Sequence, residues 1–329
     1  MSSFRNRFPV EEYVSGILAG NRIRLSQAIT LIESRLPQDR ILAQKVLEQI
    51  LPYTGKSVRI GITGVPGVGK STFIESFGKS LTNQGIKIAV LAIDPTSQKT
   101  GGSIMGDKTR MEELSHDPNA YIRPSPSGNS LGGVAHKTRE TMLLCEAAGC
   151  EVILVETVGV GQSETVVKGM VDFFLLLMLA GAGDELQGIK RGIMEMADAV
   201  VITKADSDNI QKAKNARIEY LNALHLFPPT ENAWYPPVLT CSALENSGII
   251  EIWKMIKNYE TQMNENGFWH KNRSEQNLEW MYAYIRQTLE ERFFENPIVK
   301  ENLHDYTQKV FNGELLPIQA GQALLGLEK

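Results

Sequence analysis

The chain has 329 residues, of which 42% are hydrophobic and 22% charged, and its formal net charge is −4. This composition is that of a folded protein of one large or two small domains, and it excludes a disordered chain. The slight acidic excess argues against nucleic acid as the main partner, because nucleic-acid binders usually carry an excess of Lys and Arg. The longest apolar run spans residues 173–180, far below the roughly 20 residues of a membrane span, so we expect no membrane partner.

Three cysteines are too few for a disulfide framework, and the N-terminus lacks the apolar core of a secretory signal. We therefore expect the protein in a reducing compartment, the cytoplasm.

Residues 1–55 form the first predicted region, a helical N-terminal extension. Apolar residues recur at helical spacing over residues 18–32 and again over 41–51. Pro37 separates the two segments, and Asp39 is a candidate cap for the second helix.

Residues 56–258 alternate short apolar runs with amphipathic segments. The runs lie at 58–62, 86–93, 152–155, 173–179, 199–202 and 238–239, and the clearest helical segments at 71–83, 135–148 and 209–225. Near-continuous apolar runs are typical of strands buried on both faces of a parallel sheet. The region is therefore predicted to be an α/β domain with a doubly wound, mostly parallel sheet.

Residues 259–329 are again predicted to be helical, and many of the aromatic residues gather there. Pro297 and Pro317 each stand where a new helix can begin. A segment this short cannot build a large core alone. It either packs on the α/β domain or covers its apolar residues with another chain, and the pattern leaves both open.

The first functional motif is a phosphate-binding loop, G-x-x-x-x-G-K-[ST], between a predicted strand and a predicted helix. Its residues are Gly64, Val65, Pro66, Gly67, Val68, Gly69, Lys70 and Ser71. The glycines let backbone N–H groups approach phosphate oxygens, and the helix N-terminus adds positive partial charge. Lys70 is predicted to contact the β- and γ-phosphates and the Ser71 hydroxyl to bind Mg²⁺. The chain should therefore bind a nucleoside triphosphate as a P-loop protein.

The second motif follows the predicted strand 199–202 and indicates guanine. Thr203-Lys204-Ala205-Asp206 resembles the N-K-x-D motif of GTPases, with Thr in place of Asn. The Asp206 carboxylate can accept hydrogen bonds from guanine N1–H and the 2-amino group, which adenine lacks, and the Lys204 stem can lie along the purine.

A third motif, Ser242-Ala243-Leu244, follows the predicted strand 238–239 and resembles the second base-contacting loop of GTPases. Together with the Asp206 motif, it indicates GTP and GDP as the ligands.

Three carboxylates and one glycine are candidates for the metal and hydrolysis site. Glu156 and Gly159 take the places of Asp and Gly in the D-x-x-G motif of GTPases, where the carboxylate can hold Mg²⁺ and the glycine N–H can sense the γ-phosphate. Asp94 also ends a predicted strand. Asp107 lies in a Gly-rich polar loop that suits a nucleotide-responsive switch, although it can equally cap a short helix over 108–114.

The residue that activates water is left open. Val160 stands where Ras-like enzymes carry a water-orienting Gln, and a valine cannot position water. Gln162 or one of the carboxylates can take that role. We therefore expect slow hydrolysis that a partner stimulates.

Four stretches resemble the MeaB/ArgK (MMAA-like) family of GTPases over nearly the whole chain. They are ITGVPGVGKSTF at 62–73, AIDPTSQKTGGSIMGDKTRM at 92–111, VETVGVGQSE at 155–164 and LAGAGDELQGIKRGIMEMAD at 179–198. The resemblance implies a homodimeric GTPase that serves as a chaperone of adenosylcobalamin-dependent methylmalonyl-CoA mutase or a related acyl-CoA mutase. In that family, GTP hydrolysis gates loading of the cobalamin cofactor and protects the mutase.

The resemblance also assigns residues by position. It implies that Lys70, Ser71 and Thr72 hold phosphate and Mg²⁺, and that Asp94, Asp107 and Glu156 belong to the metal and hydrolysis site. It makes Lys190 a candidate signal or catalytic residue in a third switch. Residues 259–329 resemble the family's dimerisation arm.

Two other functions share the nucleotide-binding fold. A nickel-insertion GTPase would need clusters of Cys and His, but the five histidines are dispersed and no C-x-x-C occurs. A nucleotide-dependent kinase would need a phosphoacceptor site and usually takes ATP, whereas Lys204 and Asp206 indicate GTP.

Overall fold

The computed structural model describes residues 7–34, 36–93, 111–124, 131–157, 163–181, 191–228 and 230–327. The chain divides into two compact units, Met1–Ser274 and Glu275–Lys329. In the described ranges no helix is both long and apolar enough to cross a membrane.

The first unit is built on a seven-stranded sheet in the order β3-β2-β4-β1-β5-β6-β7, and its neighbouring strands pair in parallel. The strands are β1 (Val58–Gly64), β2 (Ile88–Ile93), β3 (Ala120–Arg123), β4 (Val152–Thr157), β5 (Phe173–Leu179), β6 (Ala199–Thr203) and β7 (Val238–Thr240). The predicted doubly wound α/β fold is confirmed. Strand β3 was not predicted, because this edge strand has only four residues and is too short for a periodic signal.

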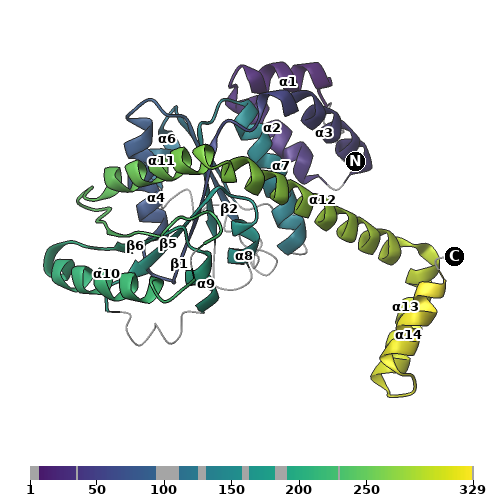
Figure 1. The fold of residues 1–329 in the computed structure, drawn as a ribbon. Helices are drawn as coiled ribbons and strands as arrows, with labels where there is room; N and C mark the ends of the chain where they lie inside the picture. The colour runs from purple at the N-terminus through teal and green to yellow at the C-terminus, as the bar shows by residue number, and fades with distance from the viewer. Residues whose placement is uncertain are drawn as a thin grey trace. The chain divides into compact units, whose positions relative to one another are not determined.

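Helices cover both faces of this sheet (Figure 1). One face packs against α4 (Lys70–Thr82), α6 (Glu112–His116) and α11 (Ile249–Glu265); the other carries α7 (Leu131–Ala147), α8 (Ser163–Lys168), α9 (Arg191–Met196) and α10 (Ile210–Leu224). Because the strands are parallel, the carboxyl ends of β1, β4 and β6 lie at one edge, which is where open α/β sheets bind ligands. The phosphate loop, Glu156 and Lys204 all follow or end these strands.

The N-terminal region packs as α1 (Val10–Leu18), α2 (Arg22–Glu33) and α3 (Pro37–Ile50), and all three helices contact α7 (Figure 1). The first predicted helical segment, 18–32, corresponds to α2, and only Leu18 belongs to the preceding α1, because the chain turns at Gly20 and Asn21 caps α2.

The expectation that Asp39 caps α3 is wrong. Leu36 is the N-cap residue, Pro37 occupies the first turn, and no side chain caps the helix. The Asp39 carboxylate is buried and instead accepts hydrogen bonds from Arg7 Nε at 2.9 Å and Nη2 at 2.6 Å. The carboxylate pairs with this guanidinium, 32 residues away, because a buried carboxylate is stabilised more by a positively charged donor than by backbone N–H groups.

The predicted border between the α/β domain and the C-terminal helices, at 258, falls inside α11. This helix buries Ile252, Ile256 and Tyr259 against the sheet. Beyond it, Arg273 in the first turns of α12 (Phe268–Glu295) binds both Asp172 oxygens at 2.7 Å. The compact unit therefore extends to Ser274.

The second unit holds the rest of α12, with α13 (Pro297–Phe311) and α14 (Pro317–Gly326). Pro297 and Pro317 occupy the first turns of their helices as expected. The hairpin of α13 and α14 buries Val299, Ala320 and Leu324.

Candidate nucleotide-binding site

The phosphate loop connects β1 to α4 and leaves its backbone open to solvent. Gly67 and Gly69 have φ of 78° and 90°, in the left-handed region that favours glycine. Pro66 and Gly67 are exposed, whereas Val68 is buried in the core and anchors the loop. The first N–H groups of α4 have no partner within the helix, so this end of α4 can receive an anion.

Lys70 folds back across the loop, and its Nζ donates a hydrogen bond to Gly64 O at 2.7 Å. Burial lowers the pKa of Lys70, while the negative charges of Glu156 and Glu164 oppose that shift. When a phosphate binds, the Lys70 ammonium group can give up its hydrogen bond to Gly64 O and donate to phosphate oxygens instead.

Ser71 and Glu156 come together beside Lys70. Ser71 Oγ lies 3.5 Å from Glu156 Oε1, and Glu156 is buried at the end of β4. A hydroxyl and a carboxylate are oxygen donors that Mg²⁺ prefers, so this pair fits two of the predicted metal ligands. Thr72 is exposed on the first turn of α4.

The end of β6 is attached directly to the phosphate loop. The Thr203 hydroxyl donates to Val68 O at 2.7 Å, and Lys204 Nζ donates to Gly67 O at 2.9 Å. Lys204 has a φ of 54°. This conformation is rare for a non-glycine residue, and the residues that adopt it cluster at functional sites. The second motif is thus held in fixed relation to the first.

Asp206 meets the third motif. Ser242 Oγ donates to Asp206 Oδ2 at 2.5 Å, and Ala205 N donates to Cys241 O at 3.0 Å. Ser242 is fully buried, Ala243 is half-buried, and Leu244 is 78% exposed. The structure therefore brings Asp206 and the loop of Ser242, Ala243 and Leu244 together, although they lie on different β-α connections.

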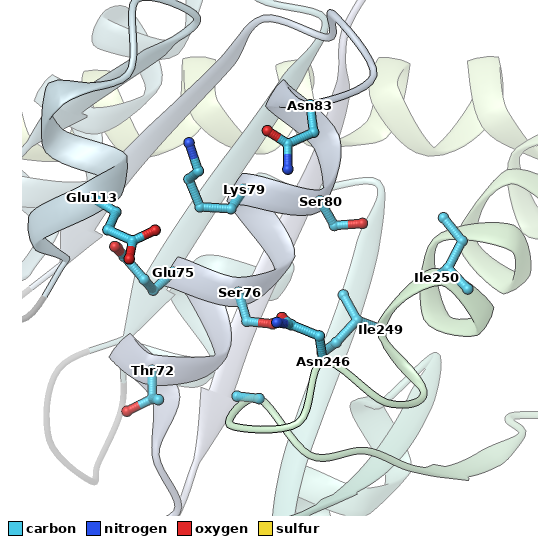
Figure 2. Close-up of a pocket in the computed structure, with 11 residues that line it drawn as sticks. Thr72, Glu75, Ser76, Lys79, Ser80, Asn83, Glu113, Asn246, Ile249 and Ile250 are labelled. Carbon is cyan, nitrogen blue, oxygen red and sulfur yellow. The ribbon is translucent and has the colours of Figure 1, made fainter.

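A cavity of about 470 Å³ lies along the outer side of α4 and reaches the same loop. Figure 2 shows Ser76 of α4 and Asn246 of the loop pointing toward each other, and Ser76 Oγ donates to Asn246 Oδ1 at 2.7 Å. This bond ties the loop after β7 to the helix that begins at the phosphate loop.

Five predicted site residues lie outside the described residues and have no structural account. They are Asp94, Asp107, Gly159, Gln162 and Lys190.

Three residues at or next to the candidate site were not predicted as part of it. Thr203 was recognised only as a replacement for Asn, and its contact with the loop needs the tertiary structure. Glu164 is 2% exposed, and its charge acts on Lys70; the sequence signal was its place at the start of a helix just after the Glu156 stretch. Thr157 donates to Thr63 at 2.9 Å inside the sheet, and joins the ends of β4 and β1.

Comparison with known proteins identifies the family. The family model "Methylmalonyl Co-A mutase-associated GTPase MeaB" matches residues 25–298. GTPase ArgK of Escherichia coli is 48% identical over 88% of both chains. The mouse protein "Methylmalonic aciduria type A homolog, mitochondrial" is 46% identical over 99% of this chain and 80% of its own length.

A solved structure agrees with these relatives. A protein described as "LAO/AO transport system kinase" matches with a TM-score of 0.76 and 40% identity, over 98% of this chain and 99% of its own. The phosphate loop, the contact between the segments that follow β6 and β7, and the family match lead to one conclusion: the chain is a GTPase and belongs to the MeaB family of methylmalonyl-CoA mutase-associated GTPases.

Proposed function

We propose that this GTPase is a chaperone of an adenosylcobalamin-dependent acyl-CoA mutase, either methylmalonyl-CoA mutase or a close relative. GTP hydrolysis gates loading of the cobalamin cofactor and protects the loaded mutase. The observation that carries this proposal is the match of residues 25–298 to a family described as mutase-associated. The name of the mouse relative supports it, since that name refers to methylmalonic aciduria.

We propose nucleotide-binding roles for the residues of the three motifs. We assign the phosphates to the loop from Gly64 to Gly69, to Lys70, and to the hydroxyl groups of Ser71 and Thr72. Lys204, Asp206 and the segment 242–244 take the guanine. The attachment of Lys204 to Gly67 O supports a single pocket with the base at one end and the phosphates at the other.

Mg²⁺ is proposed as the metal cofactor. Ser71 and Glu156 would hold it, together with Asp94 and Asp107, and the metal would neutralise charge that develops on the phosphates. Within the chain, Lys70 binds the terminal phosphate oxygens, Gly159 N–H senses the γ-phosphate, and Gln162 or a carboxylate orients the attacking water. Lys190 is the candidate residue that links nucleotide state to the partner. With no glutamine at 160, we expect turnover to be slow until the mutase binds.

We also propose a homodimer in the cytoplasm. Of the predicted arm 259–329, the dimerising part is the second unit, Glu275–Lys329. Leu278, Tyr282, Ile285 and Leu289 are between 44% and 59% exposed on α12. Their spacing of four, three and four residues places them on one side of the helix, which suits an apolar seam between two copies.

The decisive experiment measures GTP hydrolysis and mutase binding together. We expect the purified protein to bind methylmalonyl-CoA mutase with an affinity that differs between GDP and a non-hydrolysable GTP analogue, and to hydrolyse GTP at least tenfold faster when the mutase is added. Lys70→Ala should lose both nucleotide effects. If the mutase neither binds nor changes the hydrolysis rate, the proposal is wrong.

Guanine recognition has a separate test. Asp206→Asn should lower the affinity for GTP about 100-fold, because the amide loses one of the two hydrogen bonds from guanine, and a hydrogen bond to a charged group contributes about 1.5–3 kcal/mol. The amide can instead donate to the 2-oxo group of xanthine, so affinity for xanthosine triphosphate should rise. Asp208→Asn, at an exposed position two residues away, is the matched control and should change neither. Wild-type preference for ATP over GTP would favour the kinase alternative.

A further inference from the structure

Two of the three cysteines face each other across the turn that connects α7 to β4. Helix α7 ends at Ala147, and Gly149 has a φ of 88°. Gly149 N donates to Glu146 O at 2.9 Å, and Cys150 N donates to Cys145 O at 3.0 Å. This pair of hydrogen bonds is the Schellman motif, which brings the side chain after the glycine against the last turn of the helix. Here both of the meeting side chains are thiols.

The two thiols are near neighbours, since each shifts the pKa of the other. Cys145 is fully buried, whereas Cys150 is partly exposed and follows the exposed Gly149. The pair thus joins one residue with some solvent-exposed surface to one that is completely buried. Cys241, the remaining cysteine, is buried elsewhere, after β7.

The charges around the pair favour a thiolate at Cys150. Its hydrogen bond with Cys145 lowers the pKa of Cys150, and the cations Lys87 and Arg22 lower it further, while burial and Glu146 oppose them. The same hydrogen bond and complete burial raise the pKa of Cys145. A thiolate is the form that reacts with oxidants.

We propose that Cys145 and Cys150 form a reversible redox site, at which a peroxide converts the two thiols into a disulfide. Neither residue belongs to the nucleotide site, and this proposal is independent of the mutase proposal. It is consistent with a reducing compartment, where disulfides of this kind are transient and respond to oxidant.

The chemistry balances with hydrogen peroxide as the named oxidant. The Cys150 thiolate attacks one peroxide oxygen, the O–O bond breaks, and hydroxide leaves, so that Cys150 becomes a sulfenic acid. Cys145 sulfur then attacks Cys150 sulfur, the S–O bond breaks, and the hydroxyl group takes the Cys145 proton and leaves as water. Two sulfurs are each oxidised by one electron, and the peroxide is reduced by two. The 3.0 Å hydrogen bond from Cys150 N to Cys145 O holds the two residues next to each other, as formation of a disulfide requires.

The test oxidises the reduced full-length protein with hydrogen peroxide, alkylates the remaining thiols and digests after glutamate. Cleavage after Glu140, Glu146 and Glu151 separates residues 141–146 from 147–151, so these two peptides stay together only through a disulfide. We expect the linked pair, a fall from three alkylated cysteines to one, and full reversal by dithiothreitol.

Three variants assign the steps. Cys145→Ser should stop at a Cys150 sulfenic acid that dimedone traps. Cys150→Ser should leave Cys145 reduced, since it is buried. Cys241→Ser, the matched control, should form the linked peptides at the wild-type rate. The proposal is overturned if both thiols are still alkylated after peroxide, if Cys241 takes part, or if Cys145 oxidises first.

Discussion

The two helical regions that flank the α/β core have the same periodic pattern and opposite surroundings. In the N-terminal region, Tyr13, Ile17 and Ile29 are at most 2% exposed, because α1, α2 and α3 pack on one another and on α7. In the second unit, Leu278 and Leu289 of α12 are 54% and 59% exposed, and Phe311 is 85% exposed. A helical stripe of apolar residues therefore predicts that a face will be covered, but not by which chain.

This contrast separates stability from assembly. The N-terminal helices should contribute to the folding free energy of the first unit, since their apolar area leaves water when that unit folds. In the arm, the apolar residues Leu278, Leu289 and Phe311 remain exposed, and monomeric proteins avoid large exposed apolar patches. The arm is therefore our proposed interface, and four measurements test this contrast.

The largest effect is expected from matched truncations in the two regions. Ile29→Ala should lower the free energy of unfolding by about 2–5 kcal/mol, because it leaves a cavity in a packed core. Leu289→Ala should change the stability of a monomeric sample by about 0.5 kcal/mol or less. Urea unfolding over a range of protein concentrations measures both. Equal losses at every concentration would show that Leu289 supports the fold of its own chain.

The second test moves charge onto the exposed faces. Ile285→Arg with Leu289→Arg should raise the dimer dissociation constant about 100-fold or more, as expected when charges enter an apolar interface centre. Ile23→Arg is the matched control, because Ile23 is 68% exposed on α2. Analytical ultracentrifugation should show a raised dimer dissociation constant only for the arm variant. A raised constant for Ile23→Arg would mean that the interface lies on the N-terminal helices and not on the arm.

The third test compares a buried with an exposed carboxylate. The buried carboxylate is that of Asp39, and its hydrogen bond with Arg7 holds the pKa of Asp39 below the ordinary value. Asp39→Asn should therefore destabilise the protein by about 1–2 kcal/mol at pH 7, allowing for the partly exposed Arg7. A depressed carboxyl pKa adds stability above the unfolded value of about 3.9, and that contribution disappears as pH falls through the folded value.

The difference between wild type and Asp39→Asn should thus be constant from pH 6 to 8 and shrink below about pH 4. Asp305→Asn in the arm, beside Lys309 on an open helix face, should not shift the unfolding midpoint at any pH. A pH-independent difference for Asp39→Asn would mean that the Arg7 pair does not stabilise the carboxylate.

The smallest effect concerns two helix caps. The Asn21 side chain accepts hydrogen bonds from Ile23 N and Arg24 N, and that of Asn296 accepts one from Ile298 N. Asn21→Ala should cost about 1 kcal/mol in global unfolding. Asn296→Ala should cost a similar amount locally and speed hydrogen exchange only in the first turns of α13. A global loss from both variants would show that the two units unfold together.

Local signals were enough to predict the core of the fold and the phosphate loop between β1 and α4. The phosphate loop, the strand before it and the helix after it depend on glycines, buried apolar runs and helix starts, all of which act within about ten residues. The same holds for Pro297 and Pro317, since a proline at the first turn needs no distant partner.

The remaining features depend on residues that are far apart in the chain. The sequence predicts that Lys70, Asp206 and Ser242 belong to nucleotide motifs, because each follows a predicted strand of a parallel sheet. The folded chain shows what the pattern does not: Asp39 pairs with Arg7 and does not cap α3. Thr203 binds the phosphate loop, and Ser76 binds Asn246. A buried polar group pairs with whichever partner the packed chain brings within hydrogen-bond distance, because leaving it unpaired costs about 1–3 kcal/mol. That partner can lie far away in the chain, so the local sequence pattern does not predict it.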